Sequence, residues 1–230
     1  TERYTDPKTG KEKRRSDKTK NEIYRDLLQQ AVKNKIPFQY VLNDIWFATA
    51  ENMNCGNLPL KKESVMQLKG NRKAALSVDA KQQARYQRVD TLALEPMRPV
   101  TVYLEGVEFA LLLIQQVFTN EDGSTGIQYL VTSDTTLDGN GMATIYQKRW
   151  NVEPYHKSLK QNASLEKSPT QTVTTQTNHF FAALCGYIKL ELLKGDTKLN
   201  HFALKSKLYL HAIHAAFAKL RELNPAQLAA

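Results

Sequence analysis

Four polar side chains recur within one short segment, IYQKRWNVEPYHKSLK, which runs from Ile145 to Lys160. They are Tyr146, Arg149, Glu153 and Lys160 itself. At about 100° per residue, these positions lie within about 60° of one another on an α-helix. One carboxylate surrounded by cations and an aromatic ring suits an anionic ligand. A simpler interpretation stays open, because Arg149 and Glu153 also form the i,i+4 pair that stabilises many surface helices by a few tenths of a kcal/mol.

Three further residues in this segment affect the prediction. Trp150 and Lys157 flank the shared face closely. Pro154 removes a backbone donor and disfavours helical dihedral angles at the residue before it. We therefore expect a helix from about Leu137 that either kinks or breaks near Pro154.

A second carboxylate, Asp44, lies near the end of an apolar run. The run FQYVLNDIWF, residues 38–47, is aliphatic or aromatic apart from Gln39, Asn43 and Asp44, which predicts a buried strand. An ionised carboxylate in apolar surroundings must be capped, paired or bound to metal. Asp44 is thus a candidate N-cap of the following helix, ATAENM, or a candidate metal ligand.

The order of the predicted elements can bring Asp44 and Glu153 together. Two converging carboxylates form an oxygen site that suits Mg²⁺ or Mn²⁺. A pair of such ions could activate a water or a 3′-hydroxyl on one side of a phosphate and stabilise the leaving oxygen on the other. Arg149 and Lys160 would then contact DNA phosphates, and Tyr146 would contribute a hydroxyl and a ring.

The elements that must position these residues fall into five segments. Residues 1–20 are basic and poor in apolar side chains, as in a solvated arm or loop. Residues 21–70 hold an amphipathic helix and two strand candidates. Residues 71–134 predict a mainly antiparallel β insertion, with a hairpin turn at NEDGSTG. Residues 135–177 hold the helix that bears the glutamate and a polar loop, and residues 178–230 predict two amphipathic helices.

Composition restricts the classes of partner and compartment. The formal charge of +9 favours a polyanionic partner, nucleic acid first and an anionic membrane second. Only Cys55 and Cys185 are present, far apart, so the sequence predicts neither a disulfide framework nor a zinc site, and a reducing cytoplasm is the default. No apolar run approaches the roughly 18 residues of a membrane helix, and nothing resembles a signal peptide.

Four other polar residues have simpler interpretations beside a functional one. Asp134 ends the apolar strand YLVTSD, where a cap or turn role is expected. His211 and His214 lack a partner motif for metal binding, so we expect packing or surface roles. His156 lies closest to the predicted site and either contacts phosphate or has a structural role.

The spacing Y-x2-R-x3-E-x6-K resembles the signature of bacterial insertion-sequence DDE transposases. The run YVLNDIWFATAENM resembles that family's second-aspartate strand, in which Trp and another aromatic residue follow the aspartate closely. NHFFAALCGYIKLELLK and the final helix resemble its C-terminal part. The resemblance extends over nearly all 230 residues.

The resemblance implies an α/β fold: an RNase H-like core, with an antiparallel β subdomain inserted between the second aspartate and the glutamate, and C-terminal helices. It implies a transposase that cleaves transposon ends and transfers strands in cut-and-paste DNA transposition, with Mg²⁺ or Mn²⁺. Asp44 would be the second metal-binding carboxylate and Glu153 the third. The partners would be transposon-end and target DNA, with a homodimer assembled on DNA, in a cytoplasmic, nucleoid-associated bacterial protein.

The resemblance also assigns roles to the neighbours of the carboxylates. Tyr146, Arg149 and Lys160 would hold the phosphate backbone at the transposon end. Lys157 flanks them, and Trp150 would either stack on DNA or anchor the helix.

The family's first aspartate has no counterpart in this chain. Asp6 and Asp17 lie in polar, unpatterned sequence, and Asp26 falls on the solvent side of its predicted helix. We therefore expect the chain to be the C-terminal portion of a transposase, inactive alone because the first three strands of the core are missing. The alternative is a DNA-binding remnant of a transposase that performs no strand transfer. A helical interaction domain without nucleic acid is disfavoured by the charge.

Overall fold

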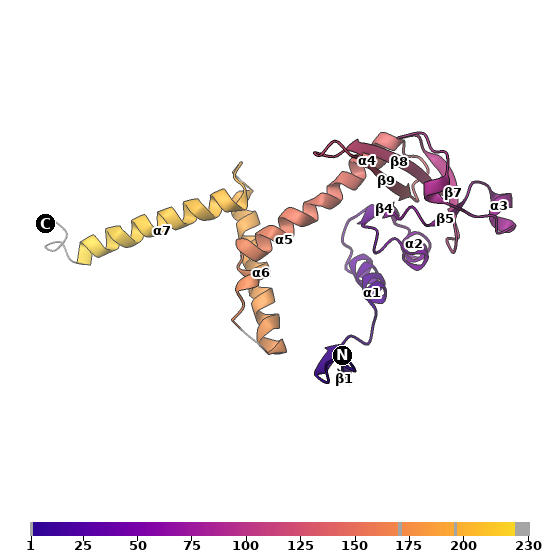
Figure 1. Cartoon of the computed structure of the whole chain (residues 1–230). Coiled ribbons are helices and arrows are strands. Elements are labelled where there is room, and N and C mark those ends of the chain that lie inside the picture. The colour runs from indigo at the N-terminus through magenta and orange to yellow at the C-terminus, as the bar shows by residue number, and fades with distance from the viewer. Residues whose placement is uncertain (1, 170–171, 196, 224–230) are drawn as a thin grey trace. The chain divides into compact units, whose positions relative to one another are not determined.

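The computed structural model describes residues 2–169, 172–195 and 197–223 (Figure 1). Its chain forms two compact units, Thr1–Arg149 (unit 1) and Trp150–Ala230 (unit 2). Across the described ranges, no helix is long and apolar enough to span a membrane. Several predicted segments include residues 1, 170–171, 196 or 224–230. At these positions the predictions lie outside the described residues.

Unit 1 begins with a hairpin and a capped helix. β1 (Glu2–Thr5) pairs antiparallel with β2 (Glu12–Arg15), so a hairpin stands where the sequence predicted an arm or a loop. Local hydrogen bonds between Asp6 and Gly10 close the turn, and Gly10 adopts a φ of 63°. A turn fixed by such local contacts does not require a buried apolar residue. The predicted amphipathic helix is α1 (Lys20–Lys33), which begins with a capping box.

A seven-stranded sheet forms the centre of unit 1, in the order β3-β4-β9-β8-β7-β5-β6. Its strands are β3 (Tyr40–Asn43), β4 (Glu63–Leu68), β5 (Lys73–Ala75), β6 (Gln87–Arg88), β7 (Val100–Leu104), β8 (Leu111–Thr119) and β9 (Thr125–Thr132). β3 and β4 run parallel, whereas each other neighbouring pair is antiparallel. The predicted NEDGSTG turn joins β8 to β9, with Gly123 at a φ of 80°. Because β9 pairs directly with β4, the strands of residues 71–134 share one sheet with the strands before them.

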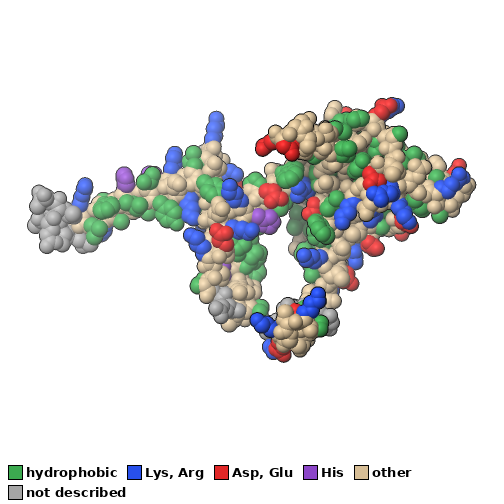
Figure 2. Space-filling view, in the orientation of Figure 1, with side chains coloured by type: hydrophobic (Ala, Val, Ile, Leu, Met, Phe, Trp, Pro, Cys, Tyr) green, Lys and Arg blue, Asp and Glu red, His purple; other side chains and the backbone are tan. Residues whose placement is uncertain are grey.

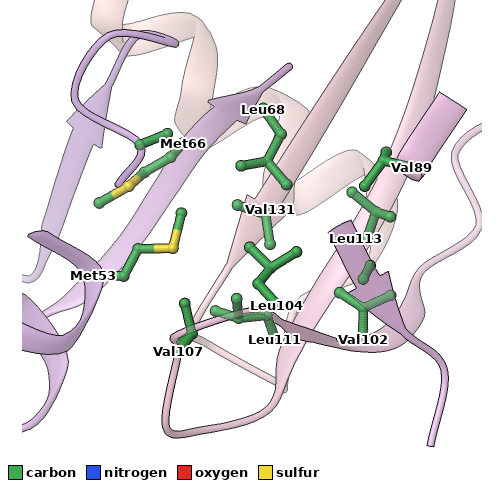
Figure 3. Packing of buried hydrophobic residues seen from close by; sticks show 12 residues of the cluster. Met53, Met66, Leu68, Val89, Val102, Leu104, Val107, Leu111, Leu113 and Val131 are labelled. Carbon is green, nitrogen blue, oxygen red and sulfur yellow. The ribbon is translucent and has the colours of Figure 1, made fainter. Parts of the chain in front are cut away.

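Apolar side chains cover both faces of this sheet. The helices of unit 1 are α1, α2 (Ala50–Asn57), α3 (Val78–Gln82), the 3-10 helix η1 (Val89–Thr91) and α4 (Gly139–Gln147). Met66 of β4 packs with Met53 of α2 in the larger cluster (Figure 3). Its neighbour Val65 packs on the other face with Met142 of α4. Since successive residues of a strand point to opposite faces, α2 and α4 cover opposite sides of β4.

Unit 2 consists of helices. They are α5 (Val152–Gln161), the 3-10 helix η3 (Leu165–Lys167), α6 (Val173–Lys194) and α7 (His201–Leu223). The two predicted C-terminal helices correspond to α6 and α7. Among the described residues of unit 2, the buried apolar side chains are Leu159, Ala183 and Leu204, whereas exposed apolar side chains recur along α6 and α7 (Figure 2).

The predicted signature helix is interrupted rather than continuous. The 3-10 helix η2 (Lys148–Asn151) follows α4 and precedes α5. Pro154 lacks the N–H that would bond the carbonyl of Trp150, and its ring crowds that carbonyl, which accounts for the change of helix type. Pro154 itself lies in the first turn of α5, where a missing N–H is tolerated. The expected kink or break near Pro154 is therefore confirmed, and the four signature residues do not lie on one regular α-helix.

Candidate active site

The carboxyl ends of the two parallel strands carry polar residues. Asp44 follows β3 directly, and Gln67 lies near the end of β4. In open α/β sheets, ligands bind outside the carboxyl ends of parallel strands. Tyr40 and Leu42 of β3 pack on the α4 face, so the two-residue alternation directs Asp44 towards that face as well.

Asp44 does not cap α2, so that interpretation of the sequence was wrong. The N-cap is Thr49, whose side chain accepts a hydrogen bond from the Asn52 backbone N–H at 3.3 Å. Asp44 Oδ1 instead accepts from the Trp46 backbone N–H at 3.0 Å, which forms a local Asx turn. No other described residue donates a hydrogen bond to this carboxylate, so Oδ2 can accept a ligand.

Asp134 differs from Asp44 in this respect. Its Oδ1 accepts from the Thr136 backbone N–H at 2.9 Å, and its Oδ2 accepts from the Tyr40 hydroxyl at 2.5 Å. The hydrogen bonds from Thr136 and then from Tyr40 lower the pKa of Asp134. The predicted turn role of Asp134 is confirmed.

Tyr146 joins α4 to β4 beside Asp44. Its ring is buried, and its hydroxyl donates to Gln67 Oε1 at 3.2 Å. The Arg149 guanidinium carbon lies 5.7 Å from the centre of the ring. Burial raises the pKa of Tyr146, the Arg149 charge and hydrogen bond oppose this, and the Asp44 charge adds to it. The phenol therefore stays protonated at neutral pH, and its single proton is donated to Gln67.

Asp44, Tyr146 and Arg149 thus gather within unit 1. Asp44 follows β3, about a hundred residues before Tyr146 of α4 and Arg149 of η2, which are near neighbours in the chain. One carboxylate with a free oxygen, one phenol and one guanidinium can together bind a cation and a phosphate side by side.

The remaining predicted site residues belong to unit 2. Glu153 is exposed in the first turn of α5, where the helix dipole favours a carboxylate. Glu153 and Lys157 line one pocket of about 640 Å³ together with Phe202, whose ring centre lies 5.5 Å from Lys157 Nζ. Lys160 is exposed in the last turn of α5. The pairing of Glu153 with Asp44 stays a prediction.

The aromatic and histidine candidates are at the surface. Trp150, at the start of unit 2, is exposed. His156 is exposed on α5, with its ring centre 5.2 Å from that of Tyr155. His211 and His214 are exposed on α7, in agreement with the surface role that the sequence predicted.

A buried polar network in unit 2 was missed by the sequence analysis. Ser158 Oγ of α5 lies 2.7 Å from His201 Nδ1 of α7, and His201 Nε2 lies 3.1 Å from Glu191 Oε1 of α6. The Tyr187 hydroxyl donates to the same Glu191 oxygen at 3.0 Å. Burial acts to raise the pKa of Glu191, but the Tyr187 hydrogen bond and the Lys194 and His201 charges lower it overall. The network holds the helix that carries Glu153, and no spacing motif in the sequence indicates it.

Asp44 offers an oxygen of the kind that divalent cations bind. Carboxylate oxygens are the ligands that Mg²⁺ prefers, and Asp44 Oδ2 can be one of them. In the part of the chain that the structure describes, no three His, Cys, Asp or Glu side chains gather as a metal-binding group.

Comparison with known proteins places most of the chain in one family. Residues 1–188 match the family model described as "Transposase DDE domain". This range includes unit 1, α5 and most of α6. A search of curated proteins found no match.

Proposed function

The chain belongs to the transposase DDE domain family, and from this premise we propose that it is the portion of an insertion-sequence transposase that carries the second and third metal-binding carboxylates. Family membership gives a mixed α/β domain with a transposase function and DNA as its partner. The observation that supports the finer proposal is the gathering of Asp44, Tyr146 and Arg149 at the carboxyl ends of β3 and β4.

In this proposal the two carboxylates and the cations have separate tasks. Asp44 and Glu153 would hold Mg²⁺ or Mn²⁺ through carboxylate oxygens. Bound divalent ions supply an activated hydroxyl and stabilise the leaving oxygen in phosphoryl transfer. Tyr146 and Arg149 would fix the phosphate that reacts. A guanidinium donates hydrogen bonds to phosphate oxygens, and the Tyr146 hydroxyl would do so by exchanging Gln67 for the phosphate.

The remaining basic and aromatic residues would extend the DNA contact. Lys157 and Lys160 would neutralise flanking phosphates, and Trp150 would lie against the DNA. We further propose that the protein acts as a homodimer assembled on transposon ends in the bacterial cytoplasm, at the nucleoid.

The family's first aspartate could be supplied by a strand that pairs with β3. Within the described part of unit 1, β3 pairs with β4 on one side and is an edge of the sheet on the other. An open edge can accept another strand through backbone hydrogen bonds. A parallel strand there would end beside Asp44, so we propose that the family's first aspartate arrives in this way from sequence outside these 230 residues. The chain alone would then lack a complete metal site.

The second candidate function is DNA binding without strand transfer. It is supported by the finding that the described residues contain no three-ligand group. Both functions predict DNA binding that weakens steeply with added salt, because the formal charge is +9. Dependence on metal distinguishes them.

The test is nicking of transposon-end DNA in Mn²⁺ by a transposase polypeptide that contains this chain and the first aspartate. Asp44→Asn and Glu153→Gln should each abolish nicking and leave DNA binding intact, since both substitutions preserve shape and remove a charged ligand. Asp122→Asn, in the turn between β8 and β9, is the matched control, because its hydrogen bonds from the Ser124 N–H and hydroxyl go to one oxygen, which an amide also supplies. Unchanged nicking in the Asp44 and Glu153 variants would refute the catalytic assignment and leave DNA binding as the function.

A further inference from the structure

Trp46 is the most exposed large apolar side chain described in unit 1. Its exposed fraction is 73%, and it lies two residues after Asp44. Single exposed apolar residues are common, but tryptophan has the largest apolar surface to leave in water. An exposed indole ring beside a candidate active site therefore needs a physical explanation.

The exposure of Trp46 does not come from a loose loop. The backbone N–H of Trp46 donates to Asp44 Oδ1 at 3.0 Å. The next residue, Phe47, stacks on Tyr24 of α1 with ring centres 5.2 Å apart and planes inclined by 24°. The Phe47 carbonyl also accepts from Asn52 Nδ2 of α2 at 2.9 Å. The loop is thus fixed on both sides of Trp46, and the ring is presented to solvent from a rigid support.

One lysine lies over the exposed ring, and a second lines the pocket beside it. Lys69, which follows β4, places Nζ 5.0 Å from the centre of the Trp46 ring. Lys20, Asn21 and Phe47 line a pocket of about 340 Å³ with Trp46. This volume lies in the range of pockets that hold small ligands. An aromatic ring flanked by lysines is the arrangement with which proteins bind single-stranded nucleic acid, by stacking on a base and neutralising its phosphates.

We propose that Trp46 stacks on an unpaired DNA base beside Asp44, with Lys69 and Lys20 on the adjacent phosphates. The base must be unpaired because both faces of a base inside a duplex are covered by its neighbours. The hydrogen bond between the Trp46 backbone and Asp44 keeps the Trp46 ring near the Asp44 carboxylate. A base stacked on this ring would therefore lie close to the phosphate at the proposed metal site. This inference rests on the proposed function for the identity of the ligand as DNA.

The two tryptophans of the chain make a direct test possible. In the Trp150→Phe variant of the full chain, Trp46 is the sole indole fluorophore. Titration with single-stranded oligonucleotide in EDTA should quench Trp46 emission, whereas a fully paired duplex of equal length should quench it much less. In the reciprocal Trp46→Phe variant, the Trp150 emission should not distinguish the two DNAs in this way.

Affinity provides the second readout. Trp46→Ala should weaken binding of single-stranded DNA by about 5- to 150-fold, the effect of losing one base–aromatic stack. Trp46→Phe should retain most of the affinity because it keeps a ring. Phe118→Ala is the matched control, since Phe118 is an exposed aromatic residue at the far end of β8. It should leave the affinity within twofold.

The outcomes separate this inference from the proposed function. Salt-sensitive DNA binding with Trp46 emission unchanged, or with wild-type affinity in Trp46→Ala, would overturn the stacking role and leave the proposed function in place. A Trp46→Ala variant that binds DNA normally but changes its oligomeric state on gel filtration would assign the ring to a protein interface and overturn the inference. Absence of DNA binding in the wild-type chain would overturn both.

Discussion

The interiors of unit 1 and unit 2 are stabilised by different kinds of buried side chain. In unit 1, two apolar clusters cover the two faces of the sheet, with Leu113, Ile114 and Val131 among the buried residues. In unit 2, the contacts between helices centre on the hydrogen-bonded Ser158 and His201, and many large apolar side chains remain exposed. A buried polar network contributes to stability only when each partner is in place.

The predicted signature is divided between these two environments. Tyr146 and Arg149 belong to unit 1, where α4 packs firmly on β4. Glu153, Lys157 and Lys160 belong to α5 of unit 2. The comparison indicates that the half of the signature with Tyr146 and Arg149 is preformed, while the half with the glutamate depends on polar contacts that open more readily.

The largest expected effect tests the apolar side of the comparison. Leu113→Ala removes a fully buried side chain of β8 and should lower the free energy of unfolding by about 2–5 kcal/mol. Leu192→Ala, the same substitution at an exposed position of α6, should change it by less than about 0.5 kcal/mol. Urea unfolding followed by circular dichroism measures both. Equal losses would mean that the two units do not differ as described.

The next effect tests the polar network. His201→Ala leaves Ser158 and Glu191 without their buried partner and should destabilise unit 2 by about 1–3 kcal/mol. Hydrogen exchange should accelerate in α5, α6 and α7, with β8 unaffected. His211→Ala, at an exposed position of α7, serves as the control. Exchange that accelerates equally in β8 would contradict the separation into two kinds of stability.

A smaller effect tests the DNA contact proposed for Arg149 at the end of unit 1. Arg149→Ala should reduce the slope of log affinity against log salt by about 0.9, as expected for one lost phosphate contact. The loss should be similar for different flanking sequences, because phosphate contacts carry no sequence information. Arg98→Ala is the control, since Arg98 pairs with Glu95 at 2.8 Å on the surface. A loss confined to one flanking sequence would assign Arg149 to base recognition instead.

The smallest effect concerns a single hydroxyl in unit 2. Burial, then the hydrogen bond to Glu191, raises the pKa of Tyr187 to about 12. The stabilisation is therefore full below the unfolded pKa of about 10 and is lost as pH rises through about 12. Tyr187→Phe should cost about 1 kcal/mol at pH 7, and its difference from wild type should shrink above pH 10. Unfolding measured at several pH values checks this, with exposed Tyr209→Phe as the control.

Local patterns in the sequence predicted several elements of unit 1 correctly. The apolar, strand-like runs at β4, β8 and β9 and the Asp-Gly turn between the last two depend on neighbouring residues, so they can be read from short segments. The strand order and the pairing of β9 with β4 depend on contacts between distant segments and were not predicted.

The same distinction explains the candidate site. The spacing of the signature predicted Tyr146 and Arg149 as site residues, and the end of an apolar run predicted Asp44. The capping role weighed for Asp44 failed because Thr49 lies closer to the start of α2 and has a side chain that can also cap. The contact of Ser158 with His201 joins residues 43 positions apart without any motif, so only the structure reveals it.

The lengths of the strands have a consequence for how this protein behaves in solution. The longest strands, β8 and β9, lie inside the sheet, while the two borders are the four-residue β3 and the two-residue β6. Edge strands this short offer few backbone hydrogen bonds to a strand of another molecule, which protects against fibrous polymerisation. A specific strand of matching length could still pair with β3, so this edge strand both limits aggregation and can accept one additional strand.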